Sequence, residues 1–317
     1  MPYPDGVHPN LKKLSESSRR LFHSCPRRYQ LYRLFQGIRQ DDGDEHLSFG
    51  SAVGAGSQSL LVDSDDMDAA IWDTFLAYSG DITDEYANRI KKTFWHAVIA
   101  VQKFYEFRHS ALQDWEVLRY GTDNKPAIEL GYTIDCGDGF VDRGLLDALL
   151  INKRNNHLMV YEGKTTTYNK IDEAAYKNSG QALGYSIIVD GIAKQLGIPL
   201  AVDNYDVFYG VFKSSGQEWE AFRFPKNNTQ RAMWIKQLFR DIQHLAEYAQ
   251  DDYFPRYGES CYAFFRPCPY VDICNMSDKA LGIANLDKIA VVDDEPEKYP
   301  FKFTLDELIQ VQLEKHQ

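Results

Sequence analysis

The sequence predicts an α/β fold in which helices pack on a mixed central sheet, with the elements in the order αβββαβ. Three short strand-like segments lie between residues 127 and 163, the first of them with alternating apolar and polar residues, and turns separate them as in an antiparallel meander. A helical segment and another strand come next. Because a helical crossover returns the chain as a parallel strand, the sheet is expected to contain both strand directions.

The first part of the chain is expected to be helical. Ser15 is placed to cap a helix, and Pro26 is suited to the start of a second one. Further along, apolar residues recur at spacings of three and four, which is the period of an amphipathic helix. The expected elements are helices at 16–24, after Pro26, at 49–61 and throughout 66–118, with a loop at 40–46.

Strands are expected to begin where this helical period ends. Short runs of alternating residues predict strands, and the Gly- and Asn-rich stretches between them predict turns. The expected elements are strands at 127–135, 140–151 and 157–163, turns at 136–139 and 152–156, a helix at 171–196, strands at 205–212 and 218–224, and a long helix at 228–250.

The chain has 317 residues, of which 44% are hydrophobic and 26% charged, a balance that excludes wholesale disorder. We expect a basic N-terminal helical segment at 1–48, a core at 49–250 with a helical insertion at 62–126, and a C-terminal segment with cysteines and an acidic tail at 251–317. No apolar run approaches the roughly 20 residues of a membrane span. Residues 1–13 contain no apolar signal core, so we expect a cytoplasmic protein.

The charge is distributed unevenly along the chain. The net charge is −11, which by itself argues against a nucleic-acid partner. Residues 11–40, however, contain eight basic residues and one acidic residue, Glu16, so this segment carries +7 and the remainder −18. Aromatic residues are interleaved with the arginines, a combination that suits phosphates and unstacked bases. An amphipathic helical region with a solvated basic face is the alternative interpretation.

Three short pieces place polar residues where a core would be apolar. Asp147 lies inside the apolar run of the second strand, and a buried carboxylate is costly unless it is paired or binds a metal. Glu162 and Lys164 are two apart on the third strand and therefore face the same side. Gln181 and Tyr185 are four apart on one helix face. Two carboxylates with a lysine suit Mg²⁺ chemistry at a phosphodiester.

This ordered set resembles the PD-(D/E)XK nuclease superfamily and, within it, the RecB-type branch, which includes CRISPR-adaptation nucleases and phage recombination exonucleases. The resemblance runs from about Ser15 to Cys274. It implies a restriction-endonuclease-like core in αβββαβ order, with Asp147 and Glu162 as ligands of Mg²⁺ or Mn²⁺, the carbonyl of Gly163 as a further ligand, and Lys164 as the catalytic lysine. Gln181 and Tyr185 match the branch's Gln-x-x-x-Tyr motif, beside the active site and DNA.

One position departs from that branch. Its members usually carry a metal-binding histidine in a Gly-x-x-Val-His piece, and here Gly54 stands in the place of the histidine. Glu129 on the first strand and Gln58, one helical turn after Gly54, are candidates to compensate. For Glu129, an outward-facing strand residue without a metal role is the simpler interpretation. Loss of the histidine is also compatible with weakened catalysis.

The chain contains five cysteines, an odd number that argues against a disulfide framework. The resemblance implies an iron–sulfur cluster, because several RecB-type nucleases hold one with an N-terminal cysteine and three near the C-terminus. Cys25, Cys261, Cys268 and Cys274 would be the four thiolate ligands of a four-iron, four-sulfur cluster and would clasp the two ends together. The gap before Cys268 is longer than usual in the family, so zinc or no metal is the alternative, and Cys136 remains as a structural cysteine.

The expected function is a Mg²⁺- or Mn²⁺-dependent deoxyribonuclease, most simply an exonuclease on single strands or DNA ends in recombination, repair or phage DNA processing. The DNA-binding candidates are Arg19, Arg20, Arg27, Arg28 and Tyr29. The alternative is a non-catalytic DNA-binding or scaffold protein on a decayed nuclease fold. Recombination or helicase proteins are conceivable partners, and the tail around Asp293, Asp294, Glu295 and Glu297 is either a protein contact or a solvated surface.

Overall fold

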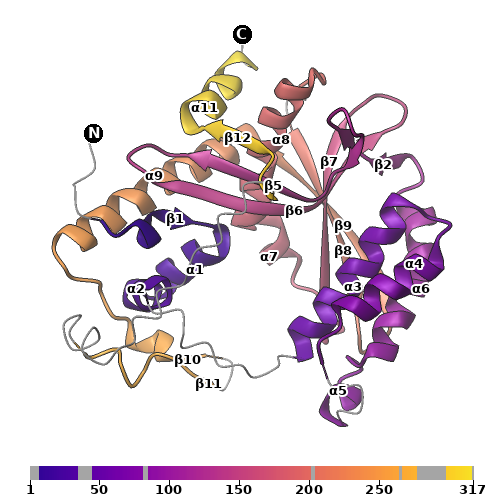
Figure 1. Cartoon of the computed structure of the whole chain (residues 1–317), viewed down its shortest axis with the longest axis horizontal. Helices are drawn as coiled ribbons and strands as arrows, with labels where there is room; N and C mark the ends of the chain where they lie inside the picture. The colour runs from indigo at the N-terminus through magenta and orange to yellow at the C-terminus, as the bar shows by residue number, and fades with distance from the viewer. Residues whose placement is uncertain are drawn as a thin grey trace. The chain divides into compact units, whose positions relative to one another are not determined.

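The structure is a computed structural model that describes residues 7–34, 45–80, 85–200, 204–263, 266–276 and 298–315 (Figure 1). The acidic tail and most of the expected loop at 40–46 lie outside these residues. The chain forms two compact units, each built from separate stretches of sequence. Unit 1 comprises Met1–Asp41, Gly131–Gly144 and Ala232–Glu307, and unit 2 comprises Asp42–Leu130, Leu145–Arg231 and Leu308–Gln317.

The strands are hydrogen-bonded in the order β12-β5-β6-β7-β8-β9, and the pairing is mixed, as the sequence predicts. In unit 2, β7 is antiparallel to β6, with Ala148 opposite Tyr161, and parallel to β8, with Glu162 beside Tyr209. β9 returns antiparallel to β8. The bounds are β5 Ile128–Asp135, β6 Val141–Asn152, β7 Leu158–Thr166, β8 Asn204–Lys213 and β9 Glu218–Asn227.

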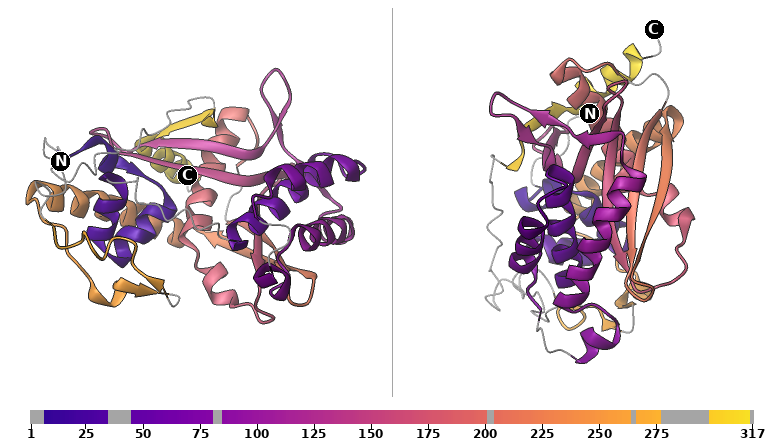
Figure 2. Two further views of the ribbon diagram at one scale, coloured as in Figure 1. Left: turned by 60° about the horizontal axis from the view of Figure 1, so that its bottom comes forward. Right: turned by 90° about the vertical axis from the view of Figure 1, so that its right-hand side faces the viewer.

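Helices of unit 2 pack beside this sheet. In Figures 1 and 2, α3, α4 and α6 lie side by side. Phe49 and Val53 of α3 are buried with Ala97 of α6 and Phe212 of β8, so the apolar stripes of two helices meet the sheet in one core. The bounds are α3 Glu45–Val62, α4 Met67–Ala77, α5 Glu85–Arg89, α6 Phe94–Ala111, α7 Glu173–Lys177, α8 Gly180–Leu196 and α11 Leu305–Glu314.

Unit 1 combines N-terminal and C-terminal segments. Ser15 caps α1 as predicted, since its hydroxyl accepts a hydrogen bond from the amide of Ser18 while the Ser18 side chain bonds back to the amide of Ser15. Short strands add to the sheet here, β1 parallel to β6 and β12 parallel to β5. The bounds are η1 Pro9–Lys12, β1 Lys13–Leu14, α1 Glu16–Ser24, α2 Pro26–Leu34, α9 Asn228–Gln250 (which begins in unit 2), η2 Gly258–Cys261, β10 Tyr262–Ala263, β11 Arg266–Pro267 and β12 Phe301–Thr304.

Three details differ from the sequence-based expectation. The helical stretch ends at Ala111, and Trp115–Val117 forms β2, antiparallel to β6. The small strands β3 Arg119–Tyr120 and β4 Lys125–Pro126 follow it. The expected helix at 171–196 is divided, because Ser179 begins a new helix by accepting a bond from the amide of Ala182. β12 and α11 were not expected. Within the described residues, no helix is long and apolar enough to cross a bilayer.

Candidate active site

Asp147 and Glu162 lie on neighbouring strands of unit 2 (Figure 1). One step beyond the Ala148–Tyr161 pair, the antiparallel register puts these two residues directly opposite one another, which places both carboxylates on the same face. Asp147 Oδ2 accepts a hydrogen bond of 2.8 Å from the amide of Gly163. Lys164 Nζ donates to Glu162 Oε1. Asp147, Glu162 and Lys164, which the sequence predicts to share one face of the sheet, therefore lie next to one another.

The negative charge of this group exceeds its positive charge. Glu162 Oε2 is buried and has no hydrogen-bond partner within the described part of the chain. Burial raises the pKa of Glu162 to about 7, and the charge of Asp147 adds to the effect. Burial also raises the pKa of Asp147. At Lys164, burial opposes the charged form, but Glu162 and Asp147 outweigh it, so the pKa of the ammonium is raised. A cation beside Glu162 Oε2 would relieve this imbalance.

Glu129 and Gln58 lie at the edge of the same group. Gln58 Nε2 donates to Glu129 Oε1 at 2.5 Å and lies 3.4 Å from the main-chain oxygen of Asp147. Glu129 has a φ of 46°, which is unusual for a residue other than glycine and marks a local distortion near the start of β5. Helix α3, which carries Gly54, therefore contacts this group of carboxylates through the side chain of Gln58. In the sequence, the only indication of this contact was that Gln58 lies one helical turn after Gly54.

Gln181 and Tyr185 form a hydrogen-bonded pair on α8. Gln181 Nε2 donates to the Tyr185 hydroxyl at 2.6 Å, and that hydroxyl donates to the main-chain oxygen of Leu145, also at 2.6 Å. Leu145 is two residues before Asp147 on β6. The pair thus fixes α8 against the segment of β6 that carries the first carboxylate.

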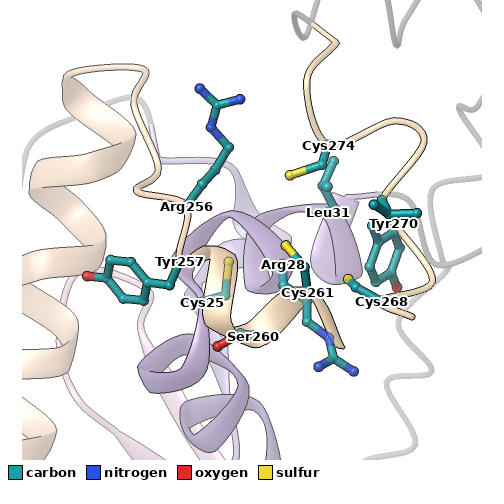
Figure 3. Close-up of a pocket in the computed structure, with 11 residues that line it drawn as sticks. Cys25, Arg28, Leu31, Arg256, Tyr257, Ser260, Cys261, Cys268, Tyr270 and Cys274 are labelled. Carbon is teal, nitrogen blue, oxygen red and sulfur yellow. The ribbon is translucent and has the colours of Figure 1, made fainter. Parts of the chain in front are cut away.

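Four of the five cysteines line one cavity of unit 1 (Figure 3). Cys25 is the buried C-cap residue of α1, and the amide of Cys268 bonds to the carbonyl of Cys261 at 2.7 Å. Figure 3 shows these side chains, with Cys274, gathered around the same space. Cys136 is absent from the lining; its buried thiol donates to the carbonyl of Ile134. All five cysteines are free thiols.

The basic residues expected to bind DNA fall into two groups. Arg19 is buried in an ion pair of 2.8 Å with Asp241, and Arg27 is buried and donates to the carbonyl of Met276. Tyr29 is fully buried and donates to the carbonyl of Leu11. Arg19, Arg27 and Tyr29 therefore stabilise the interior of unit 1 through these contacts. Arg20 is exposed and Arg28 is half-buried at the cysteine cavity.

The carboxylates and the cysteines are of the chemical types that bind metal ions, but in the described part of the chain their side chains are not already arranged around a metal position. Across the described ranges, no group of three or more His, Cys, Asp or Glu side chains is arranged as a ready metal-binding cluster. The carboxylate pair nevertheless offers hard oxygen donors, one of them without a partner, which suits Mg²⁺ or Mn²⁺. The cysteine cavity offers four thiols, which suit iron–sulfur or zinc sites.

Comparison with known proteins identifies the family. The model of the PD-(D/E)XK nuclease superfamily matches residues 13–275, and the chain belongs to this superfamily. Its members are nucleases that hydrolyse phosphodiester bonds, generally with Mg²⁺ or Mn²⁺. The expectation of a nuclease fold acting on nucleic acid is thereby confirmed. The matched range includes every residue of the candidate active site.

Two solved structures are similar at low identity. A provisionally named exonuclease from Eubacterium rectale is 12% identical, with a TM-score of 0.48, over 80% of this chain and 86% of its own. The protein SSO0001 is 12% identical, with a TM-score of 0.34, over 84% of this chain and 87% of its own. No curated protein matches the chain. The family assignment therefore rests on the superfamily model.

Proposed function

We propose that the chain is a Mg²⁺- or Mn²⁺-dependent deoxyribonuclease of the RecB-type branch. The observation that carries the proposal is the buried carboxylate pair with one counter-charge, in which Glu162 Oε2 has no partner in the described chain. Most buried polar atoms of folded proteins have a hydrogen-bond partner, so an unsatisfied oxygen beside a second carboxylate favours a bound ligand. A divalent cation supplies the missing charge and is the cofactor that the superfamily generally uses.

Each residue of the group has a role in this proposal. Asp147 and Glu162 would hold the cation, with the carbonyl of Gly163 and the carboxylate of Glu129 as further ligands. When bound, the cation would supply Lewis-acid chemistry, which lowers the pKa of a water molecule and offsets negative charge on the phosphate. Lys164 keeps its proton at neutral pH because the neighbouring carboxylates raise its pKa, so it donates hydrogen bonds to the water or to a phosphate oxygen. Gln181 and Tyr185 hold β6 in register for Asp147.

The substrate proposal is DNA with single strands or ends, cleaved as an exonuclease during recombination, repair or phage DNA processing. Arg20 and Arg28 are the proposed phosphate contacts, because Arg19, Arg27 and Tyr29 are engaged in the interior of unit 1. Helicase or recombination proteins would supply direction and unwinding in such a pathway.

The test compares linear and closed circular DNA in the presence of Mg²⁺, Mn²⁺ or EDTA. Wild type is expected to degrade linear DNA only with a divalent cation, and Asp147→Ala and Lys164→Ala are expected to lose this activity. Glu218→Ala, at an exposed glutamate of the same sheet, is the matched control and should cleave like wild type. Undiminished cleavage by both site variants would remove these residues from the mechanism.

We also propose a four-iron, four-sulfur cluster at the cysteine cavity, held by Cys25, Cys261, Cys268 and Cys274. Support comes from the common cavity and from the separation of Cys136. Protein purified without oxygen should be brown, with iron and sulfide near four each per chain. Cys261→Ser should lose the colour and Cys136→Ser should keep it. If the purified protein contains zinc and no iron, the cavity is a zinc site. If it contains neither metal, the cysteines do not form a metal site.

A non-catalytic DNA-binding protein is the second candidate, and Gly54 is the observation that favours it. The usual histidine would be a neutral metal ligand, and its absence weakens the metal site. This candidate predicts binding that falls steeply with salt and no cleavage with any divalent cation. The cleavage assay above separates the two candidates directly.

A further inference from the structure

Helix α4 of unit 2 exposes its largest side chains and buries its smallest. Trp72 is 59% exposed, Phe75 47% and Leu76 64%. Ala70 and Thr74, which face the rest of the unit, are fully buried. An ordinary surface helix has the opposite arrangement, with its apolar stripe towards the core. The exposed residues at 72, 75 and 76 lie on one side of the helix, so they form a continuous outward stripe.

The stripe continues onto α6. The rings of Trp72 and Phe75 are stacked with centroids 5.5 Å apart, and Phe75 meets the buried Phe94 edge-on at 5.8 Å. Phe94 is 5.1 Å from Trp95, which is 62% exposed. We call Trp72, Phe75, Leu76 and Trp95 the α4–α6 face. Its exposed area is on the order of 500 Å², the size at which an apolar patch on a protein marks a binding surface.

The charge on the α4 side of this face is negative. Between residues 63 and 73 the sequence has five acidic residues and no Lys, Arg or His: Asp63, Asp65, Asp66, Asp68 and Asp73. Asp68 is exposed and precedes Trp72 by one helical turn. Negative charge at this density repels nucleic acid and anionic lipid surfaces. The aromatic residues are therefore unsuited to stack on DNA bases, and a positively charged protein segment is the complementary occupant.

We propose that the α4–α6 face binds a partner protein through a basic amphipathic helix. Apolar side chains of such a helix, at spacings of three and four, would cover the tryptophans, and its lysines or arginines would face the aspartates. Tryptophan is the residue type most often found to dominate binding energy at protein interfaces. The proposal concerns residues that take no part in the carboxylate site, and it holds whether or not the chain cleaves DNA.

The probe is a fluorescein-labelled 14-residue amphipathic helix of leucine and lysine, titrated with the full chain and read by fluorescence anisotropy. Binding is expected to weaken at least tenfold in Trp72→Ser/Trp95→Ser and a few-fold in Asp68→Asn/Asp73→Asn. Tyr168→Ser, which removes a 74% exposed aromatic residue of unit 2 outside the face, is the matched control and should bind like wild type. Urea unfolding and circular dichroism check that each variant is folded.

Three results would overturn the proposal. Equal binding by the double tryptophan variant would place the peptide elsewhere, and equal binding of a leucine–glutamate peptide would remove the role of charge. A dimeric wild-type chain in light scattering that becomes monomeric with Trp72→Ser would assign the face to a second copy of this chain.

Discussion

Unit 2 contains two buried carboxylate groups that differ in how their charge is balanced. Asp190 on α8 contacts Arg231 Nη1 at 2.8 Å, Lys315 Nζ at 2.7 Å and Gln312 Nε2 at 2.5 Å. The carboxylate and both cationic side chains are almost completely buried. Asp190 thus has two cations and an amide for a single negative charge. Both carboxylate oxygens of Asp190 therefore have partners within the fold.

The pair of Asp147 and Glu162 has the opposite balance, with two carboxylates for Lys164. An unpaired buried carboxylate costs several kcal/mol, which folding alone would not favour. Both groups bury an aspartate near a lysine, so burial of a carboxylate does not by itself indicate function. We propose that the number of cations around the carboxylate distinguishes an ion pair that stabilises the fold from a metal site.

The largest expected effect is at Glu162. Glu162→Gln removes the unsatisfied charge and a proposed metal ligand together, so cleavage should fall at least about 10³-fold, or ~4 kcal/mol of transition-state stabilisation. The free energy of unfolding without metal should stay equal or rise, because the lost charge is one that burial disfavours. Initial rates on linear DNA and urea unfolding in EDTA measure the two effects. A variant that is both active and less stable would make Glu162 an ordinary ion-pair residue.

Asp190→Asn should give the reverse result. It leaves Arg231 and Lys315 buried with no carboxylate, which costs about 3–5 kcal/mol of unfolding free energy. Cleavage by the folded fraction should be unchanged, since Asp190 belongs to the other group. Urea unfolding, with cleavage assayed well below the transition, tests both statements. A loss of activity without a loss of stability would contradict the distinction between the two groups.

The sequence reveals one of these groups and not the other. Glu162 and Lys164 are two apart on a strand and Asp147 interrupts an apolar run, so local alternation is enough to predict that they share a face. Asp190 also interrupts an apolar run, but its partners Arg231 and Lys315 are far away in the sequence. Local periodicity carries no information on that pairing, so a buried ion cluster of this kind cannot be read from the chain.

Pairing between distant parts of the chain also explains why two short strands were not predicted from the sequence. Phe301–Thr304 is a four-residue strand that exists because it pairs with β5, and Trp115–Val117 is a strand because it pairs with β6. Segments this short have no period of their own, so tertiary pairing decides their structure. The strands β5 to β9 are longer and rich in apolar residues between turns, and they were predicted to within a few residues.

Another buried carboxylate, Asp142 of unit 1, is expected to make the stability of the protein depend on pH. Asp142 is 1% exposed, and its Oδ1 has no hydrogen-bond partner in the described chain. Burial raises the pKa of Asp142 to about 7, Arg19 opposes the shift, and Glu16 and Asp241 reinforce it. The folded protein therefore holds this proton more tightly than the unfolded chain. Its contribution to stability is complete below about pH 4 and is lost as the pH rises through about 7.

Asp142→Asn should remove this part of the pH dependence. Between pH 5 and pH 8 the free energy of unfolding of wild type should fall by up to about 3 kcal/mol more than that of the variant. Urea unfolding at both pH values provides the measurement. Asp135→Asn, at an exposed position on β5 of the same unit, should behave like wild type. Parallel pH profiles for Asp142→Asn and wild type would show that the carboxylate is compensated, as Asp190 is.

The smallest expected effect is at Gly54, where a Cβ would meet no heavy atom within 4 Å. Gly54→Ala should add about 1 kcal/mol of stability, the ordinary gain from replacing glycine inside a helix. Gly54→His should give a similar gain and bind Mn²⁺ several-fold more tightly in calorimetry, because position 54 shares a helix face with Gln58, which contacts Glu129. Gly56→Ala should destabilise, since its Cβ would lie 2.9 Å from the carbonyl of Ala70. If histidine at 54 leaves Mn²⁺ affinity at the level of the alanine variant, this helix does not face the metal, and Glu129 and Gln58 lose their proposed place beside the two carboxylates.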